Sequence, residues 1–559
     1  MYLRTMTRHN ADGSTVRYLQ LAHNYRDPDT KQPVAKIIYN FGREDTLDRE
    51  AIRRLIHSLS RVLSPQDAAR AHAEVQGLAF TGSRALGGAW LLDGLWRQLR
   101  LDRLAQRLWG HRKFNFPVER LLFALVAARA LAPDSKLAMQ DWVAEDVVLP
   151  GLTGVEVHDL YQVMDLVHDA QAELQHQVFT AVADLLNLEV DLLFFDTTNI
   201  YFCRDEPDRG PDGSKGFRSY GHSKEQRDDL PLVSIGLAVT REGIPIRCWS
   251  WPGNTNDASV IPEVKRDLVG WKLGRVITVV DRGFTSEDNL RFLQRAGGHY
   301  IAGEKLRGGK AEIEQALSRA GRYKSLRDNV EIKEIVVGEG QARRRFVLIR
   351  NPFEAERDRG RREQILGELR QALGALPPKT KTKDYLATIQ RLHSNSRFRP
   401  YLTLVRGTDL RIDAAKVRAD ERLDGKYLIS TSDDTLSAED AALGYRQLLE
   451  VESCFRSLKT TLELRPVYHR LEARIRAHVV LCWLALLLAR ICENKTGESW
   501  EQIRRQMQRL QVITYQGSAG QAQQCTELTD QQSRILSTLG VAPPPRIFSL
   551  QAASGQTSA

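Results

Sequence analysis

Three acidic residues stand where their carboxylates could act together on a single centre. Asp196 follows the apolar residues 192–195, and Asp281 follows the apolar residues 276–280. Continuous apolar runs of this length predict strands that are buried on both faces, so each Asp is expected at the end of a buried strand. Glu452 lies further along the chain, in a segment that predicts a helix. Converging carboxylates repel one another unless a cation neutralises them, so the three residues are candidate metal ligands.

The segment that carries Glu452 has the pattern of one long amphipathic helix. Residues 437–464 begin with a helix-capping signal, contain no proline and place their apolar side chains on one stripe. Tyr445, Glu452 and Lys459 are spaced seven residues apart, so on a regular helix they stack within about 40° of one another. Glu452 is therefore expected at the edge of a core, with a phenol before it and a cation after it.

A ligand set made only of oxygen atoms suits hard divalent cations. Mg²⁺ takes carboxylate ligands and keeps other positions open for phosphate and water. Two such ions can activate an attacking hydroxyl and stabilise the leaving oxygen of a phosphodiester. The plainer alternative is that the two Asp residues form turns, and that Glu452 and Lys459 belong to a solvated helix edge.

The sequence around these residues resembles that of a known enzyme family. Tyr445, Glu452 and Lys459 occupy the Y, E and K positions of the Y-x2-R-x3-E-x6-K signature. This signature marks the IS-four-like group of DDE transposases from bacterial insertion sequences. The stretches FFDTTN around Asp196 and VVDRGF around Asp281 look like the two Asp motifs of the same family.

The resemblance implies a DNA transposase with a ribonuclease-H-like catalytic core. Asp196, Asp281 and Glu452 would hold two Mg²⁺ ions, for which Mn²⁺ can substitute, while Lys459 and Tyr445 would orient the phosphate. Such an enzyme cleaves DNA at the ends of the insertion sequence and transfers the freed strand into target DNA. Its expected partners are the terminal inverted repeats and the target DNA, bound by a homodimer in a synaptic complex.

One position departs from the signature, because Leu448 stands where the family has an Arg. Two neighbouring cations are candidates to replace that Arg as a phosphate contact. On a regular helix Arg456 lies about 40° round from Glu452, one turn along, so it can reach the same phosphate. Arg446 lies about 140° round from Lys459, on the far side of the helix, so Arg456 is the preferred replacement.

Other cations extend the candidate DNA-binding set beyond this helix. Arg465, Arg470 and Arg474 follow closely, and the last two are one helical turn apart and suited to grip phosphates. The chain as a whole has 80 basic and 70 acidic side chains, a net charge of +10 and a pI near 9.2. This balance fits a polyanionic partner such as DNA.

The composition argues against several other classes of protein. None of the six Cys forms a C-x-x-C pair, so neither a zinc site nor a disulfide framework is indicated, and a reducing cytoplasm suits them. The N-terminus lacks the apolar core of a signal peptide. The most apolar segment, residues 479–489, is too short to span a bilayer and predicts a buried helix. A cytoplasmic protein without a membrane partner is therefore expected.

At 559 residues the chain is long enough for several domains. Asp281 and Glu452 are 171 residues apart (452 − 281 = 171), more than a minimal core needs. The predicted fold class is α/β, with a ribonuclease-H-like mixed sheet interrupted by an inserted α+β domain. The predicted parts, in order, are a small β-rich unit (1–45), a helical domain that would bind DNA ends (46–187), the first part of the catalytic core (188–305), the insertion domain (306–425), the second part of the core (426–495), and a C-terminal helix with a disordered tail (496–559).

Two other functions stay open on the sequence alone. A ribonuclease-H-like nuclease such as a junction resolvase could use the same carboxylates, although it needs neither the long insertion nor the Tyr-Glu-Lys pattern. The other alternative is a non-catalytic DNA-binding descendant of a transposase, although all three carboxylates are present. Residues 306–425 contain no Trp on which a flipped base could stack, so a hairpin intermediate is not supported. The cut-and-paste and copying pathways are not distinguished.

Overall fold

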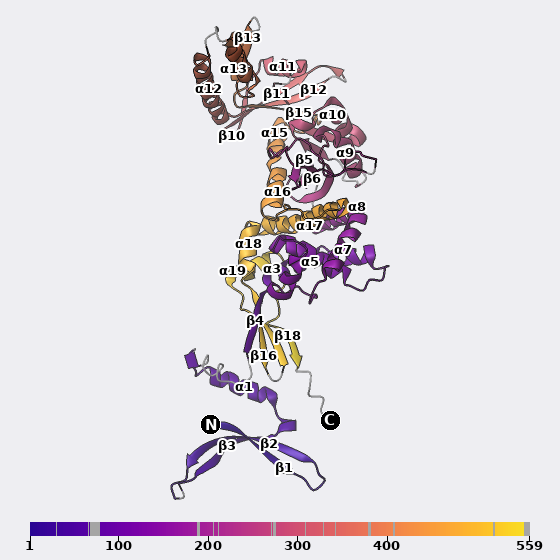
Figure 1. Ribbon diagram of the computed structural model, residues 1–559. Coiled ribbons are helices and arrows are strands. Elements are labelled where there is room, and N and C mark those ends of the chain that lie inside the picture. The colour runs from indigo at the N-terminus through magenta and orange to yellow at the C-terminus, as the bar shows by residue number, and fades with distance from the viewer. Residues whose placement is uncertain are drawn as a thin grey trace. The chain divides into compact units, whose positions relative to one another are not determined.

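The described chain has mixed secondary structure and divides into two compact units (Figure 1). The first unit comprises Met1–Thr81, Thr514–Ala522 and Leu550–Ala559, and the second comprises Gly82–Ile513 and Gln523–Ser549. The structure is a computed structural model, and the residues it describes are 1–29, 31–64, 66–67, 79–186, 191–204, 206–210, 212–269, 271, 276–307, 309–327, 329–340, 343–377, 382–405, 409–517 and 520–552.

The first unit contains a three-stranded antiparallel sheet of order β1-β2-β3. Its strands are β1 (Tyr2–His9), β2 (Thr15–Arg26) and β3 (Pro33–Arg43), within the range that the sequence predicted to be β-rich. Helix α1 (Arg49–Ser60) follows and is capped by Asp48, whose carboxylate accepts a hydrogen bond from a first-turn amide.

The second unit is organised around a nine-stranded mixed sheet of order β10-β11-β12-β15-β9-β8-β5-β6-β7. The strands β5, β8 and β9 are parallel, and the other neighbouring pairs are antiparallel. The apolar runs seen in the sequence form β5 (Leu192–Tyr201) and β8 (Ile277–Val280), which lie buried at the centre of the sheet. The remaining strands are β6 (Leu232–Thr240), β7 (Pro245–Pro252), β9 (His299–Gly303), β10 (Lys324–Arg327), β11 (Val330–Val337), β12 (Arg344–Arg350) and β15 (Lys426–Thr431).

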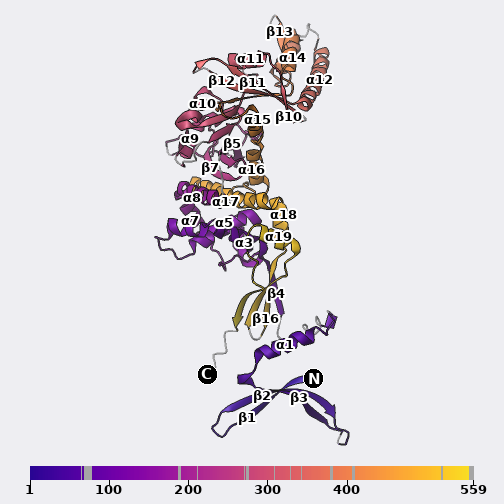
Figure 2. The same ribbon diagram turned by 180° about the vertical axis from the view of Figure 1, so that it is seen from behind.

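Helices connect several of these strands and follow the last of them in the chain. The helices α9 and α10 pack against each other, and α15 contacts β9 while the following α16 contacts α17 (Figure 2). A short turn, η3 (Asp257–Ser259), precedes α9 and is capped by Asn256. The helices are α9 (Ile261–Val269), α10 (Glu287–Gln294), α11 (Ala311–Ser318), α15 (Ala438–Arg446) and α16 (Leu449–Thr460).

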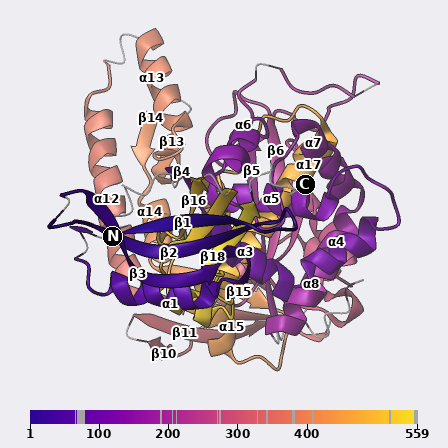
Figure 3. The ribbon, with the colours of Figure 1, turned by 90° about the horizontal axis from the view of Figure 1, so that it is seen from below.

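The region predicted as an insertion is only partly separate from the catalytic sheet. Its strands β10, β11 and β12 extend that sheet, because β12 pairs with β15 through contacts such as Phe346 opposite Ser430. The rest has its own small core, which includes Leu369, Ile389 and Leu410. Its elements are α12 (Pro352–Gly374), α13 (Thr382–Ser394), β13 (Leu402–Val405), β14 (Asp409–Ile412) and α14 (Ala414–Glu421). The elements α12, α13, β13 and β14 that carry this part lie together in Figure 3.

The helices that precede the sheet share its hydrophobic core. Leu125 from these helices, Phe195 from the sheet and Leu484 from a later helix all belong to one contiguous buried cluster. The helical region predicted as a domain is therefore packed as one body with the catalytic sheet from α3 onward. Its helices are α3 (Gly87–Gln98), α4 (Leu101–Trp109), α5 (Val118–Leu131), α6 (Ala138–Asp141), α7 (Val157–Asp169) and α8 (Gln171–Leu186).

The helix α17 (Glu472–Thr496) lies between the sheet and the preceding helices (Figure 1). It packs against β7 on one side and against α5 and α7 on the other. By length and composition it is the one described helix that could cross a membrane, but 89% of its apolar window is buried inside the fold. The sequence predicted a buried helix here and underestimated its length, because the polar residues at both ends remain helical.

The C-terminal region is folded as far as Ala552. The predicted helix is present as α18 (Trp500–Met507), and α19 (Asp530–Thr538) follows it. The sequence predicted disorder for the stretch rich in Ser, Ala and Gln that follows residues 543–545. Residues 547–552 of that stretch form a strand, so the prediction is wrong there, and residues 553–559 lie outside the described residues. A sheet of order β18-β17-β16-β4 is formed by β4 (Ala79–Ala85), β16 (Gln511–Gly517), β17 (Gly520–Cys525) and β18 (Ile547–Ala552).

Candidate active site

Asp196 and Asp281 follow the last residue pair of two neighbouring parallel strands. The register between β5 and β8 ends with Phe195 opposite Val280, so the next residue on each chain is an Asp. The strand β8 ends there as the sequence predicted, but β5 continues to Tyr201 through its pairing with β6. Asp196 therefore ends a parallel pairing and not a strand. Ligand sites in open α/β sheets form at such carboxyl ends of strands.

Asp196 is a largely enclosed carboxyl group with an altered pKa. Its Oδ1 accepts a 2.7 Å hydrogen bond from the Thr197 amide and lies 3.7 Å from Nζ of Lys224. Burial raises the pKa of Asp196 to about 6, and the carboxylates of Asp281 and Asp257 add to this effect, while Lys224 opposes it. Burial is the largest cause, so the enclosed site disfavours the charged carboxylate although an ammonium group lies nearby.

The sequence did not predict which polar side chains surround Asp196. Nζ of Lys224 lies 3.1 Å from Oδ2 of Asp257 and donates a 2.6 Å hydrogen bond to the carbonyl oxygen of Thr197. The hydroxyl of Thr197 donates a 2.6 Å hydrogen bond to Asp257. Lys224 comes from the loop between β5 and β6 and Asp257 from η3, so no local spacing connects either of them with Asp196.

Tyr445 is bonded to the second strand-end carboxylate. Its hydroxyl donates a 3.0 Å hydrogen bond to Oδ1 of Asp281. Burial raises the pKa of Tyr445, and the carboxylates of Asp281 and Glu452 raise it further, so the phenol stays protonated and remains a donor. The hydroxyl lies directly against Gly303, where a Cβ atom would not fit.

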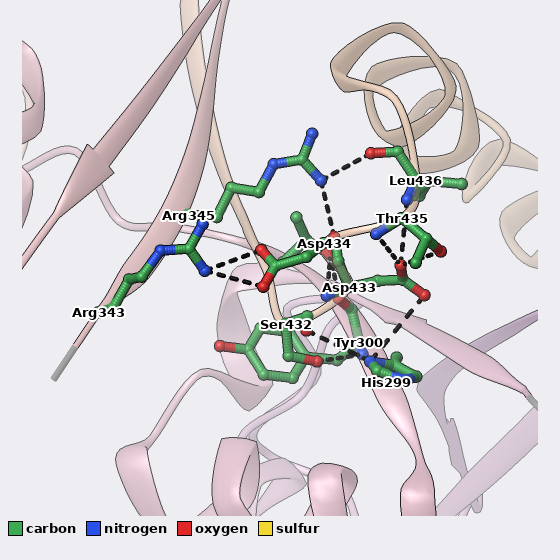
Figure 4. Close-up of polar contacts among 10 residues, drawn as sticks. His299, Tyr300, Arg343, Arg345, Ser432, Asp433, Asp434, Thr435 and Leu436 are labelled. Carbon is green, nitrogen blue, oxygen red and sulfur yellow. Dashed lines mark hydrogen bonds and ion pairs between the residues drawn. The ribbon is translucent and has the colours of Figure 1, made fainter. Parts of the chain in front are cut away.

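A polar network fixes the turn that leads into the helix of Tyr445 (Figure 4). Asp433 is completely buried, and its Oδ1 accepts hydrogen bonds of 2.8 and 3.0 Å from the amides of Thr435 and Leu436. Arg345 of β12 donates 2.7 Å hydrogen bonds to the carbonyl oxygens of Asp433 and Leu436. His299 of β9 places Nδ1 3.9 Å from Oδ2 of Asp433. Strands β9, β12 and β15 together therefore set the start of α15.

The segment that was predicted to form one helix forms two, α15 and α16. Between them the Leu448 amide bonds to the carbonyl of Tyr445, an i→i−3 contact that tightens the turn as in a 3₁₀-helix. The prediction of a single regular helix over 437–464 is therefore wrong. The angle derived for Arg446 relative to Lys459 does not apply across this break.

Glu452 is exposed in the first turn of α16. With Asp281, Tyr445 and Arg446 it lines a cavity of about 1380 Å³. Asp281 therefore borders both Asp196, whose pKa it affects, and the cavity that contains Glu452. Within the part of the chain that the structure describes, no three His, Cys, Asp or Glu side chains lie close enough to hold one metal ion.

Lys459 and Arg465, both predicted to contact phosphate, converge on one carboxylate. Nζ of Lys459 lies 2.5 Å from Oε1 of Glu225, and Nη1 of Arg465 lies 2.5 Å from Oε2 of the same residue. The guanidinium of Arg465 also lies over the ring of Tyr201, 4.5 Å from its centroid. Glu225 directly follows Lys224 in the chain. Adjacent residues of one loop thus pair with Asp196 and with the two candidate DNA-binding cations.

The remaining candidate cations have different surroundings. Arg456 is exposed on α16 and is not among the residues that line the cavity of Glu452. Arg470 is exposed, and its carbonyl oxygen accepts a 2.9 Å hydrogen bond from Arg218. Arg474 forms an ion pair of 3.0 Å with Asp165, so its charge is already neutralised within the fold.

The fold and the site define a class of nucleic-acid enzyme. A mixed sheet whose neighbouring parallel strands each deliver a carboxylate, with a third carboxylate on a following helix, is the arrangement expected of a ribonuclease-H-like core. Residues 190–488 match the model of the transposase DDE domain, and residues 3–70 match that of the IS1634 family transposase N-terminal domain. The chain therefore belongs to the transposase DDE family and is a DNA transposase of an insertion sequence. Transposases of this family bind DNA and generally use divalent metal ions.

The chain is also similar to a solved structure described as the cryo-EM structure of the piggyBac transposase synaptic complex with hairpin DNA. The sequence identity is 10% and the TM-score is 0.34, over 75% of this chain and 76% of that chain. No curated protein sequence matches the chain.

Proposed function

We propose that Asp196, Asp281 and Glu452 form the centre at which this transposase cuts the terminal inverted repeats and joins the cut strand to target DNA. The observation that carries the proposal is that Asp196 and Asp281 directly follow the last parallel residue pair of the neighbouring strands β5 and β8. In addition, the hydroxyl of Tyr445 forms a 3.0 Å hydrogen bond with Asp281. During cutting, a water oxygen bonds to phosphorus as the bond to the 3′ oxygen breaks, which leaves a 3′ hydroxyl and a 5′ phosphate. During joining, that 3′ hydroxyl displaces a 3′ oxygen of the target strand, so the number of phosphodiester bonds is conserved.

The donor groups suit the divalent ions that the family generally uses. All three ligands are carboxylates, which Mg²⁺ and Mn²⁺ prefer. The pKa of Asp196 is raised by burial and by neighbouring carboxylates, and a bound cation would relieve that repulsion. Asp196, Asp281 and Glu452 would hold two such ions, which would supply activation of the attacking hydroxyl and charge stabilisation at the phosphate.

Other side chains of the site would orient the carboxylate ligands and bind the phosphates of the DNA. Tyr445 holds Asp281 in place through its hydrogen bond, since groups that bond to ligating carboxylates orient them. Lys459 and Arg465 would bind the DNA backbone once phosphate replaces the carboxylate of Glu225 between them. A homodimer would bring two element ends together, with one such centre at each end.

A cleavage assay on DNA that carries one terminal inverted repeat tests this function. The parent protein should cut and join this DNA with Mg²⁺ or Mn²⁺ and should do neither with a chelator. Asp196→Asn and Asp281→Asn should bind the DNA but lose at least about 10³-fold in rate, because each removes a ligand of the reacting centre. Asp191→Asn is the control, since it changes an exposed carboxylate on the preceding loop.

Three results would contradict the proposal. Activity in either Asp variant close to that of the parent would remove the assigned ligands. A parent that binds the ends but cuts no DNA with either metal would be a DNA-binding descendant of a transposase. A parent that prefers branched junctions to element ends would be a junction-cutting nuclease.

A further inference from the structure

A second cavity has a floor made of basic side chains, and none of the three carboxylates Asp196, Asp281 and Glu452 lines it. It has a volume of about 390 Å³ and lies against α17 and the segment that follows Arg465. Its floor is formed by residues that are almost completely buried: Arg129 is 3% exposed, Lys136 4%, His478 3% and His469 9%. Buried cations normally have a paired anion, because an unpaired charge is costly to remove from water.

The protein itself provides no anion for this floor among the residues that the structure describes. The groups that act electrostatically on Lys136 are Arg129 and the thiol of Cys482, and no carboxylate is among them. Arg129 donates its hydrogen bonds to the backbone carbonyls of Asp134 and Glu463, while its Nε has no partner. Neutral carbonyl oxygens satisfy part of the guanidinium but do not balance its charge.

Neither nearby carboxylate forms an ion pair with Arg129 or Lys136. The carboxylate of Asp134 lies on the exposed rim of the cavity, where it accepts a hydrogen bond from the Ser135 amide. Asp165 is paired with Arg474 at 3.0 Å. The floor therefore has uncompensated positive charge and a buried, unpartnered donor, Nε of Arg129, which is the chemistry of an anion site.

The titration of the cluster agrees with this geometry. Burial, with a smaller contribution from the neighbouring Arg129, lowers the pKa of Lys136 to about 7. Burial, with Lys136 and Arg129, lowers the pKa of His469 to about 3, so this imidazole is neutral and Arg129 and Lys136 supply the charge. An anion between these two side chains would restore the charged state of Lys136.

The size and walls of the cavity indicate more than a bare phosphate ion. A volume of about 390 Å³ lies within the range of small-molecule sites. Aromatic rings stand above the floor: Tyr161 packs edge-on against His469 with centroids 6.0 Å apart, and Tyr468 is 64% exposed at the mouth. Aromatic faces are the usual surfaces on which nucleobases stack.

We propose that this cavity binds one nucleotide, with its phosphate on Arg129 and Lys136 and its base against Tyr161 or Tyr468. The phosphate belongs either to a free nucleotide or to a nucleotide of the bound DNA strand. The second source rests on the proposed DNA function, whereas the first does not. The cavity is connected in sequence to the candidate active site, because Arg465, which pairs with Glu225, directly precedes its lining residue Pro466.

Calorimetric titration of the full chain with a deoxynucleoside 5′-monophosphate tests the free-nucleotide source. The parent protein should bind the monophosphate, should bind inorganic phosphate more weakly, and should not bind the unphosphorylated deoxynucleoside. Lys136→Met keeps the side-chain length and removes the charge, and should weaken monophosphate binding by about tenfold or more. Lys495→Met, at an exposed position of α17, is the matched control and should bind like the parent.

Titration of end DNA over a range of salt concentrations tests the DNA source. If a DNA nucleotide occupies the cavity, Lys136→Met should lower the affinity and reduce the salt slope by about one charge, and the monophosphate should compete with DNA. If the occupant is a free nucleotide, DNA binding should not change while monophosphate binding is lost. Thermal unfolding of Lys136→Met, which loses a buried cation, should occur at or above the parent temperature, so misfolding is separated from lost binding.

The proposal is overturned if neither ligand depends on Lys136. That result consists of a parent and a Lys136→Met variant with the same monophosphate binding, or with none, together with identical DNA affinity and salt slope. This outcome leaves the active-site proposal untouched, because cleavage by the carboxylate centre is measured separately. Loss of cleavage in Asp196→Asn with normal monophosphate binding would in turn separate the two sites.

Discussion

At the scale of single residues, the spacing of Tyr445 and Glu452 beside an apolar stripe singled out both positions. The spacing alone is equally typical of a solvated helix edge, and the resemblance to the transposase signature supplied the roles expected of them. Lys224, Glu225 and Asp257 could not be found in this way. Each reaches the site from a loop or turn, and only tertiary folding brings it within about hydrogen-bonding range.

The residue that replaces the signature Arg is the first testable point. Arg446 lines the cavity that contains Asp281 and Glu452, whereas Arg456 does not. We therefore expect Arg446→Ala to weaken binding of end DNA and to reduce its salt slope by about one charge, because one phosphate contact is lost. Arg456→Ala, on the following helix α16, serves as the matched control and should change both quantities less. A larger loss in Arg456→Ala would restore the assignment that a regular helix predicts.

At the scale of secondary-structure elements, the break between α15 and α16 is the clearest departure from the sequence prediction. Residues 446–449 contain neither Pro nor Gly, so no local signal marks the break. Packing supplies the reason: Leu448 is buried and Tyr445 is bonded to Asp281, and both contacts are tertiary. Tertiary contacts commonly override helix propensity in this way.

The predicted insertion domain also shows what a sequence pattern does not predict. The strands β11 and β12 lie where β-rich runs occur in the sequence, but their partner strand β15 lies far along the chain. Pairing over such a separation depends on the hydrophobic faces that must be covered, and a local pattern does not encode it. The sequence therefore predicts strands here without predicting that they extend the catalytic sheet.

The loop that carries Lys224 and Glu225 offers a test at this scale. Glu225 occupies the position between Lys459 and Arg465 that a DNA phosphate would need. Glu225→Gln should therefore bind end DNA more tightly, by about threefold to tenfold at low salt, because a competing anion is removed. Filter binding or anisotropy over a salt series measures the effect.

The matched control for this loop is Asp229→Asn. It removes the same single negative charge four residues further on, where Asp229 pairs with Arg227 and is exposed. The control should leave the affinity within about twofold, since long-range effects between exposed charges are screened. Equal tightening in both variants would show that net charge, and not the Glu225 contact, governs binding.

At the scale of the whole molecule, one core joins the helices before the sheet, the sheet and α17. The mixed α/β class and the buried central strands follow from composition and from apolar runs, which are local properties. The sharing of one core between the helical region and the sheet does not, because it depends on which apolar faces meet. Lys136 and Arg129 are buried in this assembly for the same reason, although the sequence presents them as ordinary cations.

The buried cluster around Lys136 predicts how global stability changes with pH. Burial lowers the pKa of Lys136 from 10.5 to about 7 in the folded protein, so between these values the unfolded chain holds a proton that the folded protein lacks. Lys136 should therefore contribute a gain in stability as the pH rises, of about 2 kcal/mol between pH 7 and pH 9 as an upper limit. Of the groups that face Lys136, Arg129 keeps its charge, and burial keeps His469 and His478 neutral in the folded protein. In the unfolded chain these two His residues lose their protons near pH 6.5, mostly below this window.

Chemical denaturation at a series of pH values measures this effect. Burial also raises the pKa of the thiols of Cys248, Cys454, Cys482, Cys492 and Cys525, and their ionisation in the unfolded chain lowers stability as the pH rises. The contribution of Lys136 is therefore measured as the difference in stability between the parent and Lys136→Met, which should grow between pH 7 and pH 9, whereas the difference between the parent and Lys495→Met should stay constant. The same slope in Lys136→Met as in the parent would show that Lys136 does not titrate in this window.

The central claim is that Glu452 completes the reacting centre with Asp196 and Asp281. The most direct measurement compares end-DNA binding and Mg²⁺-dependent strand cleavage on the same preparations of the parent, Glu452→Gln and Glu439→Gln. Glu452→Gln keeps the side-chain size and leaves the phosphate-binding cations intact, so binding should stay within about twofold while cleavage and joining are lost. Glu439→Gln, at an exposed position of α15, should retain both. Cleavage by Glu452→Gln at the parent rate would contradict the account, because Glu452 would then not be the third ligand.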